Sequence, residues 1–224
     1  MQIQLETQKF SSISTDALVT YIFDQENKLD GIVGEINHSM NGQLASLVES
    51  GELTGKPNEI VFVHFPTGLG AQRLLLIGAG KPAKFMTNDL RKIAGTALRY
   101  LKSRGAKKFV FVTQEGERGP NAAQAVVEGL ITADFESNKY HTEKKPNREI
   151  QSVSLANFDQ GLGANLTAAI EQGRVIADST NFARDLINEP SNRLTPRMLA
   201  ARAEAMAKEA GLAVEILATH RGTV

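Results

Sequence analysis

Short apolar runs alternate with segments of helical periodicity through residues 1–155 of this 224-residue chain, and this alternation limits the fold more than any other feature. The runs are rich in β-branched, aliphatic and aromatic residues, as strands are, and lie at residues 3–5, 17–23, 59–64, 73–77, 108–113 and 150–155. Apolar residues recur at helical spacing in residues 90–101 and 122–133. The alternation predicts a layered α/β domain with helices on both faces of its sheet.

Polar and conformationally special residues indicate where several elements begin and end. Thr87 is predicted to be the N-cap of the first helix. The second helix is predicted to start at Gly119-Pro120, since proline is tolerated in a first turn. The runs at 59–64 and 73–77 are nearly continuous, which predicts central strands covered on both faces. Gly68-Leu69-Gly70 indicates a hairpin connection between these two strands.

The last third of the sequence has a different organisation. Residues 165–188 have the character of one long helix, which the polar residues 188–192 with their proline bring to an end. Thr195 followed by Pro196 predicts a further helix with threonine as its N-cap, and residues 214–217 are predicted to begin a strand. About 35 residues rarely hold a core alone, so we expect the opening of a second domain whose remainder lies outside this sequence.

Composition narrows the function class. Twenty-five basic residues balance twenty-five acidic ones, so no global field favours nucleic acid or an anionic membrane. The sequence has no cysteine, which excludes disulfides and thiolate chemistry and fits a reducing compartment. Its first residues lack the pattern of a signal peptide, and no apolar run approaches the roughly 18 residues of a membrane span. We expect a soluble, cytoplasmic chain.

Residues that bind metals or act as nucleophiles form no recognisable motif. The four histidines are far apart and none lies in an H-E-x-x-H pattern: His38, His64, His141 and His220. Of these, His64 is interpreted as a core or edge residue of a strand. Two carboxylate pairs fit solvated surface better than a divalent metal site: Glu115 with Glu117, and Asp134 with Glu136. No serine lies in a G-x-S-x-G turn. The sequence therefore predicts no catalytic, metal-binding or cofactor-binding residue in this chain.

Glycine-rich and basic segments are the remaining candidates for binding sites. Residues 78–81 (Gly-Ala-Gly-Lys) follow a strand but complete neither a P-loop nor a dinucleotide fingerprint, so a tight exit from the strand is favoured. Two basic clusters are interpreted as paired or solvated surface: Lys102, Arg104, Lys107 and Lys108, and Lys139, Lys144, Lys145 and Arg148. The clusters lack the interleaved aromatic residues of a nucleic-acid stacking platform.

Between residues 173 and 203 the sequence closely resembles the segment that joins the two domains of leucyl aminopeptidases, the cytosol aminopeptidase family. The matching residues are Gly173, Ala177, Asn181, Ala183-Arg184-Asp185-Leu186, Asn188-Glu189-Pro190, Asn192, Thr195-Pro196 and Leu199-Ala200. Upstream, weaker fragments resemble the family's N-terminal domain in order and spacing: residues 47–55, 68–71, 73–78, 90–95 and 128–130, then Phe135 and the loop 139–146. The resemblance extends to about residue 217.

Membership of this family would imply an α/β/α N-terminal domain similar to the macro domain, with a mixed sheet, followed by a linking helix and a catalytic domain. The implied domains are residues 1–160 for the macro-like domain, 161–190 for the linker helix and 191–224 for the start of the peptidase domain. The family's metal-binding motifs, V-G-K-G-x-x-F-D-x-G-G and N-T-D-A-E-G-R-L, do not occur in this sequence. The resemblance thus places two manganese or zinc ions in the rest of the parent, and predicts that this chain alone is inactive.

Two functions follow from this comparison. In the first, the chain aids assembly and shapes access to the active site of a homo-hexameric aminopeptidase, with the C-terminal catalytic domain of the same parent as its partner. In the second, it is a stand-alone binding module. That module would bind an ADP-ribose-like ligand near the loops after Ile77 and Thr113, or DNA through the two basic clusters.

Overall fold

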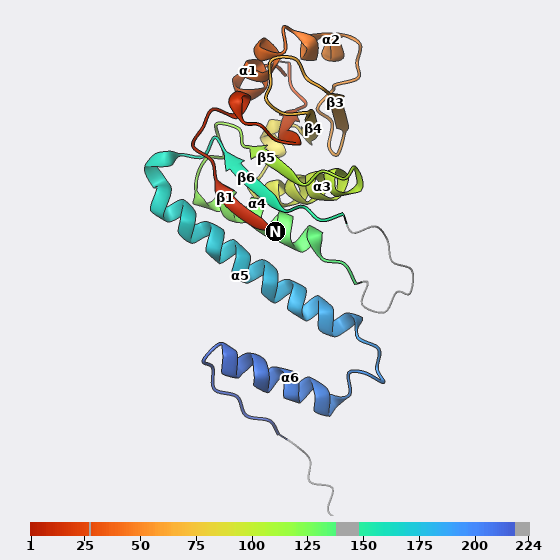
Figure 1. Cartoon of the computed structure of the whole chain (residues 1–224), viewed down its shortest axis with the longest axis vertical. Helices are drawn as coiled ribbons and strands as arrows, with labels where there is room; N and C mark the ends of the chain where they lie inside the picture. Colours follow the sequence, from red (N-terminus) through yellow and green to blue (C-terminus); the bar gives the residue numbers. More distant parts are fainter. Residues whose placement is uncertain (27, 138–147, 218–224) are drawn as a thin grey trace, which may run out of the picture. The chain divides into compact units, whose positions relative to one another are not determined.

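A mixed six-stranded sheet forms the centre of the computed structural model, which describes residues 1–26, 28–137 and 148–217 (Figure 1). Its strands are β1 (Gln2–Leu5), β2 (Ala17–Phe23), β3 (Ile60–His64), β4 (Arg73–Gly80), β5 (Lys108–Val112) and β6 (Ser152–Ala156). They lie in the order β1-β6-β5-β2-β4-β3, and all neighbours are parallel except β3, which is antiparallel to β4.

Helices follow most strands and cover both faces of the sheet. They are α1 (Gly31–Ser39), α2 (Gln43–Glu49), α3 (Asp89–Ser103), α4 (Pro120–Asp134), α5 (Gly163–Asn188) and α6 (Pro196–Glu209). The chain divides into two compact units, Met1–Ser179 and Thr180–Val224, so α5 begins in the first unit and ends in the second. No helix in the described part of the chain combines the length and apolar character needed to cross a membrane.

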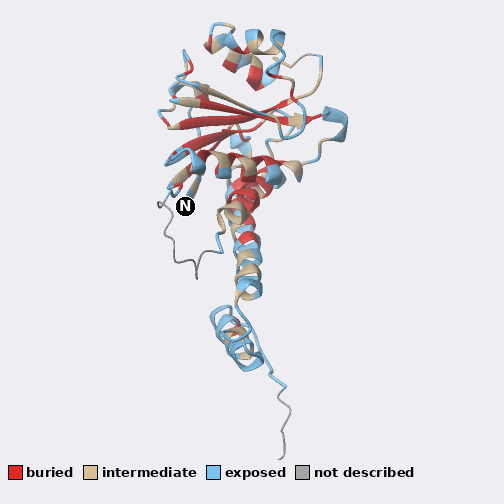
Figure 2. Ribbon diagram, turned by 90° about the vertical axis from the view of Figure 1, so that its right-hand side faces the viewer, coloured by how far each residue is buried: buried red, intermediate tan, exposed pale blue. Residues whose placement is uncertain are grey.

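Alternation of side chains along each strand produces two separate cores. Val19 and Tyr21 on β2 pack with α3, α4 and the first turns of α5, whereas Leu18 and Ile22 pack with α1 and α2. Both sets are almost fully buried, which Figure 2 shows as a red sheet between two helical layers. The predicted three-layer α/β/α fold with a mixed sheet is therefore confirmed.

Glycines allow the helices of one layer to approach each other closely. A Cβ atom at Gly129 of α4 would clash with the backbone carbonyl of Arg91 on α3, and one at Gly95 would lie 3.2 Å from the Gly129 carbonyl oxygen. Gly173 of α5 meets α4 in the same way, because a Cβ there would lie 2.9 Å from the carbonyl oxygen of Gln124. Small residues at these crossings set how closely α3, α4 and α5 pack.

Most predicted boundaries agree with the structure, and one cap does not. Helix α4 begins at Pro120, and the Thr195 hydroxyl of α6 accepts a hydrogen bond from the Met198 amide at 3.4 Å. Thr87 does not cap α3, which begins at Asp89. The carboxylate of Asp89 instead accepts a hydrogen bond from the Met86 amide at 3.0 Å. The first residue of α3 thus stabilises the turn that precedes the helix.

Strand β3 is an edge strand, which corrects the prediction that it is central. Its residues are exposed or half-buried, whereas β4 is buried. The hairpin connection between the two strands is confirmed, since the Phe65 amide donates to the Gln72 carbonyl at 2.8 Å and Gly68 turns the chain at φ 77°. Helix α3 covers one face of β3, and α1 and α2 cover the other, so residues on both faces of this strand are apolar. A nearly continuous apolar run therefore cannot distinguish an edge strand of this kind from a central strand.

Two further differences concern elements of secondary structure. Helices α1 and α2 were not predicted, although Ile32, Val33, Ile36, Met40 and Leu44 provide a buried stripe at helical spacing. The strand predicted from residue 214 is wrong, because residues 212–217 have no regular structure. An apolar run becomes a strand only where another strand can accept its hydrogen bonds, and the described residues offer none to this segment.

The second unit is organised by ion pairs. Arg202 of α6 lies 3.6 Å from the carboxylate of Asp185, in the last turn of α5, and 3.2 Å from that of Glu189, which directly follows α5. The side chain of Glu189 is only 2% exposed. By contrast, large apolar side chains of α6 are exposed, including Leu199 at 45% and Met206 at 40%.

Substituting Gly129→Ala should destabilise the first unit by about 1–3 kcal/mol, because the added methyl group must displace α3 from α4. Urea unfolding of the full chain, followed by circular dichroism, measures this change. The matched control is Gly163→Ala at the start of α5, where a Cβ meets nothing within 4 Å. The control should be neutral or slightly stabilising, and equal effects at both positions would contradict the packing argument.

Candidate functional site

The carboxyl ends of β2 and β5 are where a sheet of this topology would bind a ligand. Strand β2 leads into α1 and α2 on one face, and its neighbour β5 leads into α4 on the other. Adjacent strands whose connections leave in opposite directions create the crevice used by ligands of open α/β sheets. Residues Tyr21 to Phe23, Thr113 and Gln114 form this position.

Polar groups at this edge are bonded to one another. The Gln114 side-chain amide donates to the Tyr21 carbonyl at 2.5 Å, and the Gln114 backbone amide donates to the Tyr21 hydroxyl oxygen at 3.2 Å. The Thr113 hydroxyl donates to the Glu117 carbonyl at 2.6 Å, and Asn157 donates to the Thr113 carbonyl at 2.8 Å. These groups serve to join β2, β5 and the loop that follows β6.

Aromatic rings fill the space beside these hydrogen bonds. Phe85 stacks on Tyr21 with 5.5 Å between ring centroids, and it meets Phe23 edge to face at 5.1 Å. Tyr21 is fully buried, and this burial raises the pKa of its hydroxyl to about 12. The edge of the sheet is thus packed with the chain's own side chains.

The glycine-rich segment 78–81 has a different role from the one predicted. Gly78 and Gly80 are the last residues of β4, not a turn that leaves it. The Gly80 amide donates to the Gly55 carbonyl at 2.9 Å, and a Cβ at Gly78 would clash with the carbonyl of Lys56. Both glycines therefore let residues 55–56 lie against the strand, and the Gly80 amide is occupied by backbone.

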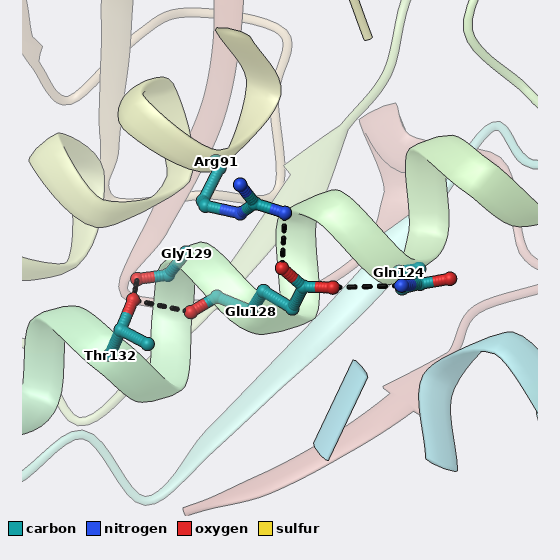
Figure 3. A network of polar contacts seen from close by, with 5 residues as sticks. All are labelled: Arg91, Gln124, Glu128, Gly129 and Thr132. Atoms are coloured by element: carbon teal, nitrogen blue, oxygen red, sulfur yellow. Dashed lines mark hydrogen bonds and ion pairs between the residues drawn. The ribbon is translucent and has the colours of Figure 1, made fainter. Parts of the chain in front are cut away.

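A cavity of about 380 Å³ lies between the first turns of α3 and α4. Its lining includes Arg91 and Glu128, which form an ion pair, and Gln124, whose amide donates to the other Glu128 oxygen at 2.8 Å (Figure 3). The Glu128 side chain is 5% exposed and that of Arg91 is 44% exposed. Because both carboxylate oxygens are engaged, we interpret this network as a link between α3 and α4.

The predicted histidines and carboxylates lie at scattered positions. His38 is exposed on α1, and His64 is exposed at the end of β3, as the interpretation of an edge residue requires. His141 and His220 lie outside the described residues. Glu117 accepts a hydrogen bond from the Thr87 hydroxyl at 3.2 Å, and Glu115 is exposed.

The sequence indicated that Asp134 and Glu136 are solvated surface residues, but in the structure both form ion pairs. Each lies 2.7 Å from the ammonium group of Lys102. Burial alone would lower the pKa of Lys102, but its hydrogen bonds to these two carboxylates raise it. Among residues 1–26, 28–137 and 148–217, no group of three or more potential ligands could hold a metal ion.

The first basic cluster agrees with its prediction as paired surface at Lys102 and differs from it in having an aromatic neighbour. Lys102 is neutralised by its two carboxylates, and the Arg104 guanidinium lies 5.1 Å from the ring centroid of Tyr100. An aromatic side chain therefore does accompany the first cluster, and α3 supplies it from the preceding turn. Of the second cluster, Arg148 donates to the Ser103 carbonyl, and Lys139, Lys144 and Lys145 lie outside the described residues.

Replacing Glu128→Ala should lower the free energy of unfolding by about 1–3 kcal/mol, because Arg91 and Gln124 lose their shared acceptor in a largely buried place. Chemical unfolding of the purified chain tests this. Glu171→Ala is the control, since Glu171 forms an exposed ion pair with Arg174 at 3.7 Å and should contribute less than about 1 kcal/mol. A Glu128 variant as stable as the control would show that the network does not join the helices.

Alkaline pH should destabilise the fold through Tyr21. With an unfolded pKa near 10 and a folded pKa of about 12, the unfolded chain loses this proton first, so the contribution is complete below pH 10 and is lost as pH rises towards 12. Unfolding free energies of wild type and Tyr21→Phe at pH 8 and pH 11 measure it. The wild type should lose more stability between these pH values than the variant, and equal losses would refute the assignment.

Known sequences match this chain over nearly its whole length. Residues 19–144 match the sequence model described as the N-terminal domain of the cytosol aminopeptidase family. A probable cytosol aminopeptidase from Koribacter versatilis is 35% identical over 239 residues, covering 98% of this chain and 46% of the relative. One from Solibacter usitatus is 38% identical and covers 97% of this chain and 42% of the relative. The chain thus spans less than half the length of these relatives.

Solved structures agree on the fold. A tomato leucine aminopeptidase variant superposes with a TM-score of 0.80 at 22% identity, covering 94% of this chain and 43% of that one. The bottromycin maturation enzyme BotP gives a TM-score of 0.64 at 19% identity over 89% of this chain and 38% of that one. The resemblance predicted from the sequence is confirmed, since the family match covers more than half of the residues: this chain belongs to the cytosol aminopeptidase family.

Proposed function

We propose that this chain is the N-terminal, non-catalytic part of a leucyl-aminopeptidase-type enzyme, which releases N-terminal amino acids from peptides. In this proposal residues 1–160 are the macro-like domain, residues 161–190 are the linker helix and residues 191–224 begin the peptidase domain. Two manganese or zinc ions would be bound by the rest of the parent. We further propose a cytoplasmic, homo-hexameric parent in which this part aids assembly and shapes access to the active site.

The exposed apolar surface of the second unit carries this proposal. Five apolar side chains of α5 and α6 in this unit are 40–82% exposed: Phe182, Ile187, Met198, Leu199 and Met206. Figure 2 shows α6 mostly in pale blue. A helix pair held by buried and half-buried ion pairs has a defined structure, yet it buries little apolar surface of its own. Such a surface is typical of a segment that the remaining half of a longer protein covers.

The carboxylates of the first unit support a non-catalytic role. Glu128 is bonded to Arg91 and Gln124, while Asp134 and Glu136 are paired with Lys102. Attack on a peptide bond by a metallopeptidase needs a metal-bound water and groups that stabilise the oxyanion. Glu128, Asp134 and Glu136 would have to break existing ion pairs before they could bind such a metal.

The alternative of a stand-alone binding module receives less support. The position where an ADP-ribose-like ligand was expected, after Ile77 and Thr113, is occupied by Phe85, Tyr21 and the side chain of Gln114. The basic cluster that favours DNA has Lys102 already neutralised. Calorimetric titration with ADP-ribose and a salt-dependent DNA shift assay would measure either activity directly.

The purified 224-residue chain should not hydrolyse leucyl-anilide with added manganese or zinc. A fusion of this chain to the remaining part of the Solibacter usitatus relative should hydrolyse it, because the fusion restores the peptidase portion and covers the second unit. The control is that same peptidase portion without the 224 residues, which should be less active or less soluble. Clear turnover by the chain alone would refute the non-catalytic assignment, whereas an inactive fusion that folds would refute the proposed parent.

A further inference from the structure

One side of β3 carries backbone groups that no described residue bonds. The Gly78 amide donates to the Glu59 carbonyl and the Phe65 amide donates to the Gln72 carbonyl, both at 2.8 Å, so residues 59 and 65 face β4. In an antiparallel pair this orientation alternates, and the amide and carbonyl groups of Ile60, Phe62 and His64 therefore point away from β4. Strand β3 is the last strand of the sheet on this side.

This edge lacks the features that normally prevent strands from pairing. Residues 60–65 (IVFVHF) contain no lysine, arginine, carboxylate or proline, although natural edge strands commonly carry charge or proline. Ile60 is 37% exposed, and Phe65 just beyond the strand is 80% exposed. The opposite edge strand, β1, has only four residues.

Phe65 adds an unusual backbone conformation. Its φ is 51°, in the left-handed region, and within residues 1–26, 28–137 and 148–217 the other non-glycine residues with positive φ are Asn41, Asn58 and Asn157. Asparagine tolerates this backbone conformation, whereas for phenylalanine it is sterically unfavourable. The chain therefore maintains a strained residue and exposes its ring to solvent, beside a row of aromatic contacts that runs from His64 through Phe62 to Tyr100.

We propose that β3 pairs with β3 of a second copy of this chain, antiparallel about a two-fold axis at Phe62. Ile60 of one copy then lies opposite His64 of the other, and the two Phe62 residues lie opposite each other. All outward amide and carbonyl groups of residues 60, 62 and 64 become hydrogen-bonded in this register. The two sheets become one continuous sheet.

Neighbouring registers are disfavoured by the residues at the ends of β3. A shift by two residues in one direction places Ile60 opposite Pro66, which has no amide to donate. The opposite shift places His64 against Asn58, whose amide already donates to Gly78 at 3.0 Å. Shifts by one residue would set outward groups against inward ones. The register centred on Phe62 is therefore the one in which β3 of a second copy pairs best with this strand.

Side chains on the α3 face complete the match. Ile60, Phe62 and His64 share one face of the sheet because side chains alternate along a strand. The Phe62 ring lies edge to face with His64 at 4.8 Å and with Tyr100 at 5.2 Å, and Arg104 lies over Tyr100 at 5.1 Å. Aromatic and arginine side chains of this kind are enriched at the centres of protein interfaces.

Cysteine cross-linking tests the register, because the natural chain has no cysteine. The full chain carrying both Ile60→Cys and His64→Cys should form a covalent dimer under mild oxidation, since paired Cα atoms roughly 5.5 Å apart suit a disulfide. Positions 60 and 64 of one strand lie roughly 13 Å apart, too far for a bond within one chain. Each single variant should therefore remain uncross-linked alone, and an equal mixture of the two should give the dimer.

Sedimentation of the same full chain provides the second measurement. Wild type should form a dimer whose dissociation constant rises at least ten-fold with Ile60→Lys and His64→Lys combined, because two lysines then face each other across the pair. Val175→Lys on α5, where the native side chain is 63% exposed, is the control and should leave the dimer unchanged. A monomeric wild type, a double cysteine variant that does not cross-link, or single variants that cross-link equally well would each overturn the proposal.

Discussion

Burial of the central strands on both faces is the constraint on which the rest of the first unit depends. Adjacent residues of β2, such as Leu18 and Val19, have no exposed surface although they point to opposite sides of the sheet. Each face therefore needs its own helical layer, α1 and α2 on one side and α3, α4 and the start of α5 on the other. The glycine contacts between α3, α4 and α5 then follow from fitting three helices over one face.

The same constraint shapes the chemistry of the domain. Polar groups that lie near this core are bonded within the chain: Gln114 to Tyr21, Glu128 to Arg91 and Gln124, and Lys102 to Asp134 and Glu136. Buried polar groups without partners are costly, so such pairing is expected of a scaffold. By contrast, the apolar side chains Phe182, Ile187, Met198, Leu199 and Met206 of α5 and α6 are exposed in the described part of the second unit.

Much of the fold was predictable because its signals are local. The apolar runs of the sequence indicated all six strands of the sheet. Pro120 and Thr195 indicated where α4 and α6 begin. The prediction was wrong where the local sequence pattern does not reveal the position of a segment in the tertiary structure. The apolar run of β3 resembled a buried strand although it lies at an edge, and residues 214–217 resembled a strand although they have no partner among the described residues.

The sequence by itself determined the layered α/β class, the long helix and the family, because periodicity and short ordered motifs can be recognised without coordinates. Only the tertiary structure decided what occupies the carboxyl edge of the sheet, which carboxylates are neutralised and which strand is left open. These properties depend on contacts between residues far apart in the chain, as between Tyr21 and Gln114, which are 93 positions apart. Packing of the whole domain selects such pairs, and no local pattern specifies them.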